Sequence, residues 1–191
     1  MKRWFALYPQ GVRRQTFTPF RVLARRSVLA LCLMFIAWAA ATPAVADTMR
    51  GVVIVVIDGD TVLFKPDHYH PSGRAFLKIR LADIDAPEKD QPYGDVATRA
   101  LTALVLDQRV EVVTVAIDAY GRTIARIQVG GVSVNVELVR QGLAWGSSRY
   151  RRNAELTAAQ SDARQAQRGI WHEAAPVPPW VWRREHSVTV H

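Results

Sequence analysis

The run Val-Val-Ile-Val-Val-Ile, which fills residues 52–57, constrains the fold more than any other part of the chain. β-branched side chains favour extended backbone, and an unbroken apolar run of this length is typical of a buried strand. The run ends at Asp58-Gly-Asp60, a sequence that is typical of a turn. We therefore predict a strand from Arg50 to Ile57, followed by a turn in which the glycine lets the chain bend sharply.

Four further segments have the composition of strands, and three others have apolar residues at helical spacing. The expected strands are residues 61–65, 75–81, 109–115 and 123–129, and the expected helices are residues 95–106, 134–141 and 154–167. Asn153 is a typical N-cap, and Gly142 and Gly169 are typical helix stops. Five short strands with interspersed helices predict an α+β protein, a five-stranded Greek-key β-barrel with three helices, of which the OB-fold is the best-known case.

The first 46 residues have the three parts of a secretory signal peptide. Seven basic residues and no acidic one are combined with an uncharged apolar run from Val28 to Ala41 and the small-x-small sequence Ala44-Val-Ala46. The apolar run is shorter than the roughly 20 residues that a membrane-spanning helix needs. We predict a cleaved leader and a secreted or periplasmic protein without stable membrane association. An uncleaved anchor is the alternative, and Arg25-Arg26 leaves the choice between Sec and twin-arginine export open.

The basic character of the chain belongs almost entirely to this leader. The whole chain has 25 Lys and Arg against 17 Asp and Glu, and seven of the basic residues precede residue 47. The nearly neutral remainder has no general attraction for nucleic acid, so any phosphate binding has to come from local arrangement. The single cysteine, Cys32, also lies in the leader, which excludes disulfides, thiolate metal sites and cysteine nucleophiles from residues 47–191.

Carboxylates gather at the ends of two expected strands. Asp58 and Asp60 flank a glycine after the first strand, and Asp85 and Glu88 flank Ala-Pro beyond the third. Hard cations such as Ca²⁺ prefer several oxygen ligands of this kind. Asp83 is a further carboxylate that could complete a cation site. A simple turn is the alternative for the first segment, and a solvated acidic loop is the alternative for the second.

Two arginines complete the pattern. Arg80 ends an apolar run, and Arg122 follows a Tyr-Gly turn. A guanidinium group binds two phosphate oxygens at once and stays charged at any working pH. Two such groups beside a cation site are the equipment of a metal-assisted phosphodiesterase, whose transition state concentrates negative charge on phosphorus. Because Arg80 and Asp85 would face opposite sides of a regular strand, a shared site requires a bulge or a strand end between them.

These segments resemble the staphylococcal nuclease (thermonuclease) family. The resemblance extends from about Val52 to Trp171 and keeps both the identity and the spacing of Asp58 to Asp60, Arg80 to Glu88 and Asp118 to Arg122. It implies an OB-fold nuclease that uses Ca²⁺ to hydrolyse DNA and RNA.

The resemblance also implies a role for individual residues. The family's two catalytic arginines and its catalytic glutamate, which acts as general base or orients the water, correspond to Arg80, Arg122 and Glu88. Its calcium ligands correspond to Asp60, Asp85 and the backbone carbonyl of Ala86, with Asp58 supporting them from outside the coordination shell. The side chains that remain to stack on nucleobases are Tyr120 and Tyr150.

Two positions depart from the family's nucleotide pocket. Ala119 replaces a lysine before the Tyr-Gly turn, and Ser148 replaces the first residue of a Tyr-x-Tyr pair. One stacking partner is therefore missing, and we expect catalysis to persist with altered affinity or base preference.

We therefore expect residues 47–174 to form a monomeric, calcium-dependent phosphodiesterase with little sugar specificity. The alternative is a noncatalytic OB-fold module that binds nucleic acid or a protein ligand. Residues 175–191 form a tail, which we predict to be extended from Pro176 to Trp182. Trp180 and Trp182 are expected to pack against the barrel as a clasp, with base stacking as the alternative.

Overall fold

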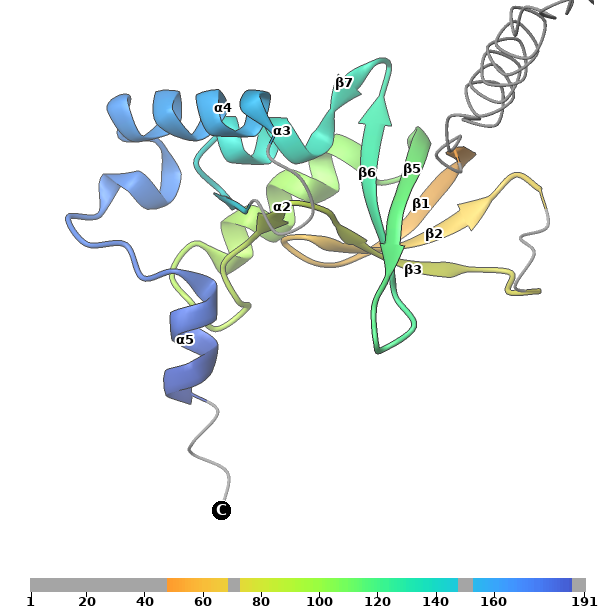
Figure 1. Ribbon diagram of the computed structural model, residues 1–191, viewed down its shortest axis with the longest axis horizontal. Helices are drawn as coiled ribbons and strands as arrows, with labels where there is room; N and C mark the ends of the chain where they lie inside the picture. The colour runs from red at the N-terminus through yellow and green to blue at the C-terminus, as the bar shows by residue number, and fades with distance from the viewer. Residues whose placement is uncertain (1–47, 69–72, 148–152, 187–191) are drawn as a thin grey trace, which may run out of the picture. The chain divides into compact units, whose positions relative to one another are not determined.

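Five strands in the predicted order form the barrel of this protein (Figure 1). The computed structural model describes residues 48–68, 73–147 and 153–186, which belong to one compact unit. The barrel strands are β1 (Thr48–Asp58), β2 (Thr61–Pro66), β3 (Leu77–Leu81), β5 (Arg109–Ile117) and β6 (Thr123–Val129). Each of the five expected strands is confirmed, with bounds that shift by up to two residues.

A parallel pairing closes the barrel. The strands follow the order β3-β2-β1-β5-β6 with antiparallel neighbours, and β3 then pairs with β6 in parallel, with Ile79 opposite Thr123. Closure satisfies backbone groups that would otherwise remain at two open sheet edges. The result is the five-stranded barrel of the OB-fold that the sequence predicts.

Three helices cover one side of the barrel, as expected (Figure 1). They are α2 (Gly94–Val105), α3 (Val134–Arg140) and α4 (Ala154–Gln165), and a 3₁₀ helix, η1, follows at Gly169–His172. The Asn153 side chain caps α4 by accepting from the backbone N–H groups of Glu155 and Leu156. Gly142 and Gly169 have φ of 70° and 54°, conformations that glycine adopts without a steric penalty.

The C-terminal tail is helical from Pro179 to His186, so the prediction of an extended segment is wrong for residues 179–182. Residues Pro179–His186 form a fourth described α-helix, α5. Proline suits the first turn of a helix, because its fixed φ is helical and its missing N–H would have no partner within the helix there. The carbonyl of Pro178 accepts from the N–H groups of Val181 and Trp182 and starts the helix. The prolines therefore precede and open a helix instead of continuing an extended chain.

Three very short strands complete the fold. They are β4 (Ile84–Asp85), β7 (Val132–Ser133) and β8 (Trp145–Gly146). β4 pairs with β8, so the segment that carries Asp85 is tied to the chain after α3. Among the helices of the described residues, none is both long and apolar enough to span a lipid bilayer.

Gly59 allows a close approach between the first hairpin and α2. A Cβ atom at this position would lie 2.7 Å from the Cβ of Ala86 and 2.9 Å from the Cβ of Ala97. Its φ is not positive, so the need for glycine comes from packing and not from the sharp turn that the sequence suggested. The β1–β2 turn thus lies directly against the segment that follows β4.

We expect Gly59→Ala to lower the free energy of unfolding by about 1–3 kcal/mol, the usual cost of overpacking a tight interior contact. Both clashing atoms are Cβ atoms fixed to the backbone, so the turn has to move away from Ala86. Urea denaturation measures the change. Gly146→Ala is the matched control, because its added Cβ would have no non-neighbouring atom closer than 3.5 Å. Equal stability of the two variants would contradict the packing role of Gly59.

Candidate active site

The two pairings of β3 bring segments from both sides of the barrel to Arg80. Arg80 lies opposite Thr61 in β2 and opposite Ile124 in β6. Asp60 immediately precedes the first of these neighbours, and Arg122 lies two residues before the second. A cleft of about 570 Å³ occurs here, and it is lined by eight of the predicted residues: Asp58, Asp60, Arg80, Asp85, Ala86, Glu88, Tyr120 and Arg122.

A turn between β3 and β4 places Arg80 and Asp85 in one site. β3 ends at Leu81, and Asp83 has φ of 61°, in the left-handed region. The chain therefore leaves the strand between the two residues, and the predicted strand end is confirmed. Arg80 Nη2 donates to Asp85 Oδ1 at 2.7 Å.

Asp83 holds this turn in place. Its side chain is fully buried, and Oδ2 forms an ion pair with Arg126 Nη2 at 2.6 Å. Its backbone carbonyl accepts from the N–H of Ser147 at 2.7 Å. Asn135 Nδ2 donates to the carbonyl of Ala82 at 2.8 Å. Asp83, which the sequence left as a further candidate for the cation site, is therefore committed to Arg126.

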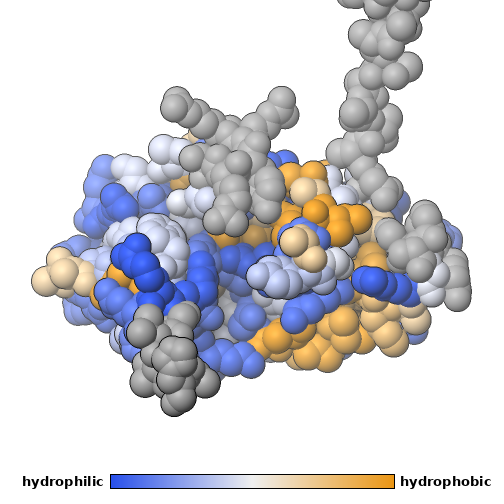
Figure 2. Space-filling view, turned by 60° about the horizontal axis from the view of Figure 1, so that its bottom comes forward, coloured by the Kyte–Doolittle hydropathy of each residue, from blue (hydrophilic) through white to orange (hydrophobic). Residues whose placement is uncertain are grey.

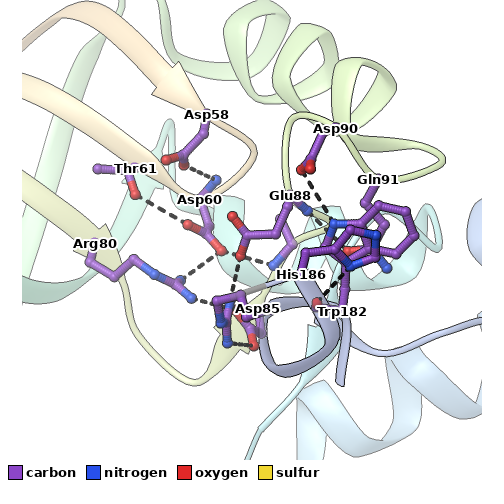
Figure 3. Close-up of polar contacts among 12 residues, drawn as sticks. Asp58, Asp60, Thr61, Arg80, Asp85, Glu88, Asp90, Gln91, Trp182 and His186 are labelled. Atoms are coloured by element: carbon purple, nitrogen blue, oxygen red, sulfur yellow. Dashed lines mark hydrogen bonds and ion pairs between the residues drawn. The ribbon is translucent and has the colours of Figure 1, made fainter. Parts of the chain in front are cut away.

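Arg80 is clamped between backbone carbonyls and carboxylates, and Figure 3 shows its contacts with the carboxylates of Asp60 and Asp85. Its Nη1 donates to the carbonyls of Leu81 and Ile84 at 3.1 and 3.0 Å. The same nitrogen lies 2.8 Å from Asp60 Oδ2, and the side chain is 17% exposed. Together with the bond to Asp85, these contacts fix the plane and position of the guanidinium group.

Asp60 is an almost fully buried carboxylate of the cleft, at 6% exposure. Its Oδ2 accepts from the backbone N–H of Ala86 at 2.8 Å, and its Oδ1 accepts from Thr61 Oγ1 at 3.2 Å. Desolvation raises the pKa of Asp60 to about 7, although the charge of Arg80 opposes this shift. Asp58 Oδ1 accepts from the N–H of Asp60 at 3.1 Å. Asp58 thus supports the Asp60 backbone.

A third arginine, Arg183 on α5, contacts the carboxylates of Asp85 and Glu88, and sequence reasoning missed it. Arg183 Nη1 donates to Glu88 Oε1 at 2.5 Å, and Nη2 donates to Asp85 Oδ2 at 2.8 Å. The hydrogen bond to Asp85, followed by that to Glu88, raises the pKa of Arg183 despite partial burial. An amphipathic reading of residues 179–186 would have found the helix, but no local signal links Arg183 to carboxylates 95 and 98 residues away.

Asp118 organises the β5–β6 loop around the other predicted arginine. Its Oδ1 accepts from the backbone N–H groups of Tyr120 and Arg122 at 3.0 and 2.9 Å. Its Oδ2 accepts from Arg122 Nε at 2.7 Å. Desolvation alone would raise the pKa of Asp118, but the hydrogen bonds from Arg122 and Tyr120 lower it overall. Arg122 faces the cleft, and the Tyr120 residue is 85% exposed.

The face from which the β5–β6 loop and α5 project in Figure 1 is turned toward the viewer in Figure 2. Hydrophilic side chains gather there, and an apolar area borders them. A polar cleft of this kind suits a charged ligand that also presents apolar rings.

The donor chemistry of the cleft fits a hard cation. Asp60 and Asp85 supply carboxylate oxygens, and the bond from the Ala86 N–H to Asp60 brings the predicted ligands side by side. Across residues 48–68, 73–147 and 153–186, no three acidic, histidine or cysteine side chains are arranged to hold a metal ion. The predicted set has two carboxylates and one carbonyl, so water or substrate oxygens have to supply the other ligands.

The remaining predictions fall on the loops and the tail. Tyr150 and Ser148 lie outside the described residues, and Ala119 lines the cleft. The tail tryptophans do pack onto the domain, but their contacts are not with the barrel strands. Trp180 makes an edge-on contact with Trp145 at 5.6 Å between ring centroids, and Trp182 Nε1 donates to Asp90 at 3.3 Å.

Comparisons with known proteins point in one direction. The family model described as "Staphylococcal nuclease homologue" matches residues 78–173. An uncharacterized endonuclease of Escherichia coli O157:H7 is 37% identical over 159 residues, which cover 83% of this chain and 97% of that protein. A micrococcal nuclease of Shigella flexneri is 33% identical over 172 residues, which cover 84% and 92%. The segment matched by the family model contains Arg80, Glu88 and Arg122, whereas Arg183 lies beyond it.

We expect Arg126→Met to destabilise the fold by about 3–5 kcal/mol, because it leaves the buried Asp83 carboxylate without its ionic partner. Urea denaturation checks this value. Arg50→Met is the control, since the ion pair between Arg50 and Glu111 is exposed at 75% and 45%. Its loss should cost less than about 1 kcal/mol. A similar small cost for both variants would show that Asp83 does not depend on Arg126.

Proposed function

This chain belongs to the staphylococcal nuclease family, and on that premise we propose that it is a calcium-dependent phosphodiesterase acting on both DNA and RNA. Relatives named endonuclease and micrococcal nuclease support a nuclease that hydrolyses nucleic acids. The observation that carries the proposal is the single cleft lined by Arg80, Arg122 and Glu88 together with two further carboxylates, Asp60 and Asp85.

Arg80 and Arg122, the two arginines identified from the sequence, bind the phosphate and stabilise its charge. Negative charge increases on the phosphoryl oxygens as a water molecule attacks, and guanidinium groups that are already in place stabilise this charge. Arg80 is held by Asp60 and Asp85, and Arg122 by Asp118, so neither has to be ordered during the reaction. Arg122 acts on the side of the leaving oxygen.

Glu88 is the group that handles the proton of the attacking water. Its side chain is 37% exposed at the cleft, so water can reach it. A carboxylate at this position accepts the proton as the new P–O bond forms, or orients the water if another base accepts the proton. Pro87 precedes Glu88, and the Glu88 backbone N–H donates to Gln91 Oε1 at 3.1 Å, which fixes the backbone from which the side chain projects.

The calcium ion would be held by Asp60, Asp85 and the backbone carbonyl of Ala86. When bound, it supplies positive charge that stabilises the phosphate transition state. Burial and Arg80 already hold Asp60 in place, so the chain contributes one ligand that is fixed before any cation arrives.

Substrate bases would stack on Tyr120, which is 85% exposed beside the cleft, and on Tyr150. Stacking of this kind is sequence-tolerant, because every base has a π-face. Because stacking involves the base and not the sugar, it is consistent with the proposed action on both DNA and RNA.

We further propose that residues 1–46 direct export, so that a monomeric enzyme acts in the periplasm or outside the cell. This proposal rests on the leader sequence alone. The second candidate function, a noncatalytic OB-fold binding module, is disfavoured because the chain retains Arg80, Glu88 and Arg122 together in one cleft.

Glu88→Gln should lower the rate of cleavage of single-stranded DNA in the presence of Ca²⁺ by about 10²–10⁴-fold. It should leave the fold intact, because Glu88 is partly exposed. Arg80→Ala is a poorer test, since removing Arg80 leaves the buried Asp60 and Asp85 without a cation. The assay compares wild type and variants with Ca²⁺ and with a chelator.

Glu111→Gln is the matched control for this assay. Glu111 lies on β5 and pairs with Arg50 at the surface, so it loses the same charge outside the cleft. We expect wild-type turnover for this variant. Near wild-type turnover of Glu88→Gln would overturn the catalytic assignment, and full activity of the wild type in the chelator would overturn the calcium requirement.

A further inference from the structure

The guanidinium group of Arg183 occupies the same carboxylates that the proposed reaction needs. It bonds both oxygens of Asp85, through Nη1 at 3.2 Å and Nη2 at 2.8 Å. Its Nη1 also bonds Glu88 Oε1 at 2.5 Å. One side chain from the C-terminal helix thus bridges the proposed calcium ligand and the proposed base.

Helix α5 is docked on the segment that carries these carboxylates. Gln91 Nε2 donates to the carbonyl of Val177 at 2.6 Å, just before the helix. Trp182 Nε1 donates to Asp90, as Figure 3 shows. Trp180 lies against Trp145. Val177 makes its contact just before α5, and Trp180 and Trp182 make theirs within it. Together these contacts determine where Arg183 lies.

The two arginines on Asp85 differ in how firmly they are held. Arg80 is 17% exposed and bonded to the carbonyls of Leu81 and Ile84 as well as to two carboxylates. Arg183 is 44% exposed and projects from an eight-residue helix at the end of the described chain. A cation that needs Asp85 can displace Arg183 at lower cost than Arg80, because Arg183 can move into water.

The bridge also interferes with the proposed chemistry. Both oxygens of Asp85 accept from guanidinium groups, so a cation bound there competes with these bonds and is repelled by the charge of Arg183. The Glu88 oxygen that accepts from Arg183 directs a lone pair at an N–H group, and that lone pair cannot accept a proton from water at the same time.

We propose that Arg183 is an internal competitor of the divalent cation, which sets the calcium affinity of the site. Arg183 bridges Asp85 and Glu88 in the cation-free protein, and cation binding displaces it from both. This inference rests on the proposed calcium site at Asp60 and Asp85. Arg183 acts through these carboxylates and is a positioning residue.

The test is the calcium affinity of Arg183→Gln, measured by titration calorimetry on protein purified after expression of the full chain. Loss of a competing cation should lower the Kd for Ca²⁺ about tenfold, equal to about 1.4 kcal/mol. If Arg183 had only a structural role, its loss should raise the Kd for Ca²⁺, because a disordered site binds calcium more weakly.

Arg184→Gln is the matched control. Arg184 lies on the same helix and makes no ion pair with any residue that the structure describes. The Arg184→Gln variant therefore loses the same formal charge away from the site. Its Kd for Ca²⁺ should remain within about twofold of the wild type, since exposed charges are screened. Equal Kd values for the Arg183 and Arg184 variants would overturn the competition, as would weaker binding by Arg183→Gln.

Hydrogen exchange gives a second readout on the wild-type protein. Saturating Ca²⁺ should speed exchange of the backbone amides in residues 179–186, because displacement of Arg183 removes contacts that hold α5. Unchanged exchange with calcium bound would overturn displacement. If none of the three proteins binds calcium, the proposed calcium site itself fails, a result that is distinct from equal binding by all three.

Discussion

The register of β3 against its two neighbours is the constraint on which the site depends. The antiparallel pairing places Thr61 opposite Arg80, and the parallel pairing places Ile124 opposite it. A shift of β3 by one residue against its neighbours would turn the Arg80 side chain to the other face of the barrel. Backbone hydrogen bonds and the buried side chains of β3 therefore determine which charged groups meet in the cleft.

The charges of the cleft depend on one another in the same way. Arg80 compensates two carboxylates that are almost fully buried, and one of them, Asp60, still has a raised pKa. Burial is the main cause of that raised pKa, and the charge of Arg80 offsets it only in part. The guanidinium group of Arg183 adds a second positive charge beside Asp85.

Local sequence predicted the barrel well, because β-branched runs, the cap at Asn153 and the stop at Gly142 each act within a few residues. The cleft residues were predicted from the resemblance to a known family and not from local signals. The strand register brings these residues together, so their spacing along the chain is characteristic of the fold. The position of Arg183 could not be predicted, because its partners are 95 and 98 residues away. The sequence suggests that Gly59 serves a sharp turn. Its packing against Ala86 and Ala97 depends on tertiary structure, which local sequence does not reveal.

The three bonds of Asp118 have a consequence for recognition. They hold the loop that presents Tyr120 in its final shape, although the Tyr120 residue is 85% exposed. A ligand that stacks on Tyr120 meets a rigid platform, so the conformational entropy of the loop is lost during folding and not during association. The loop is therefore ordered before any ligand arrives, and a ring that stacks on Tyr120 would not have to order it.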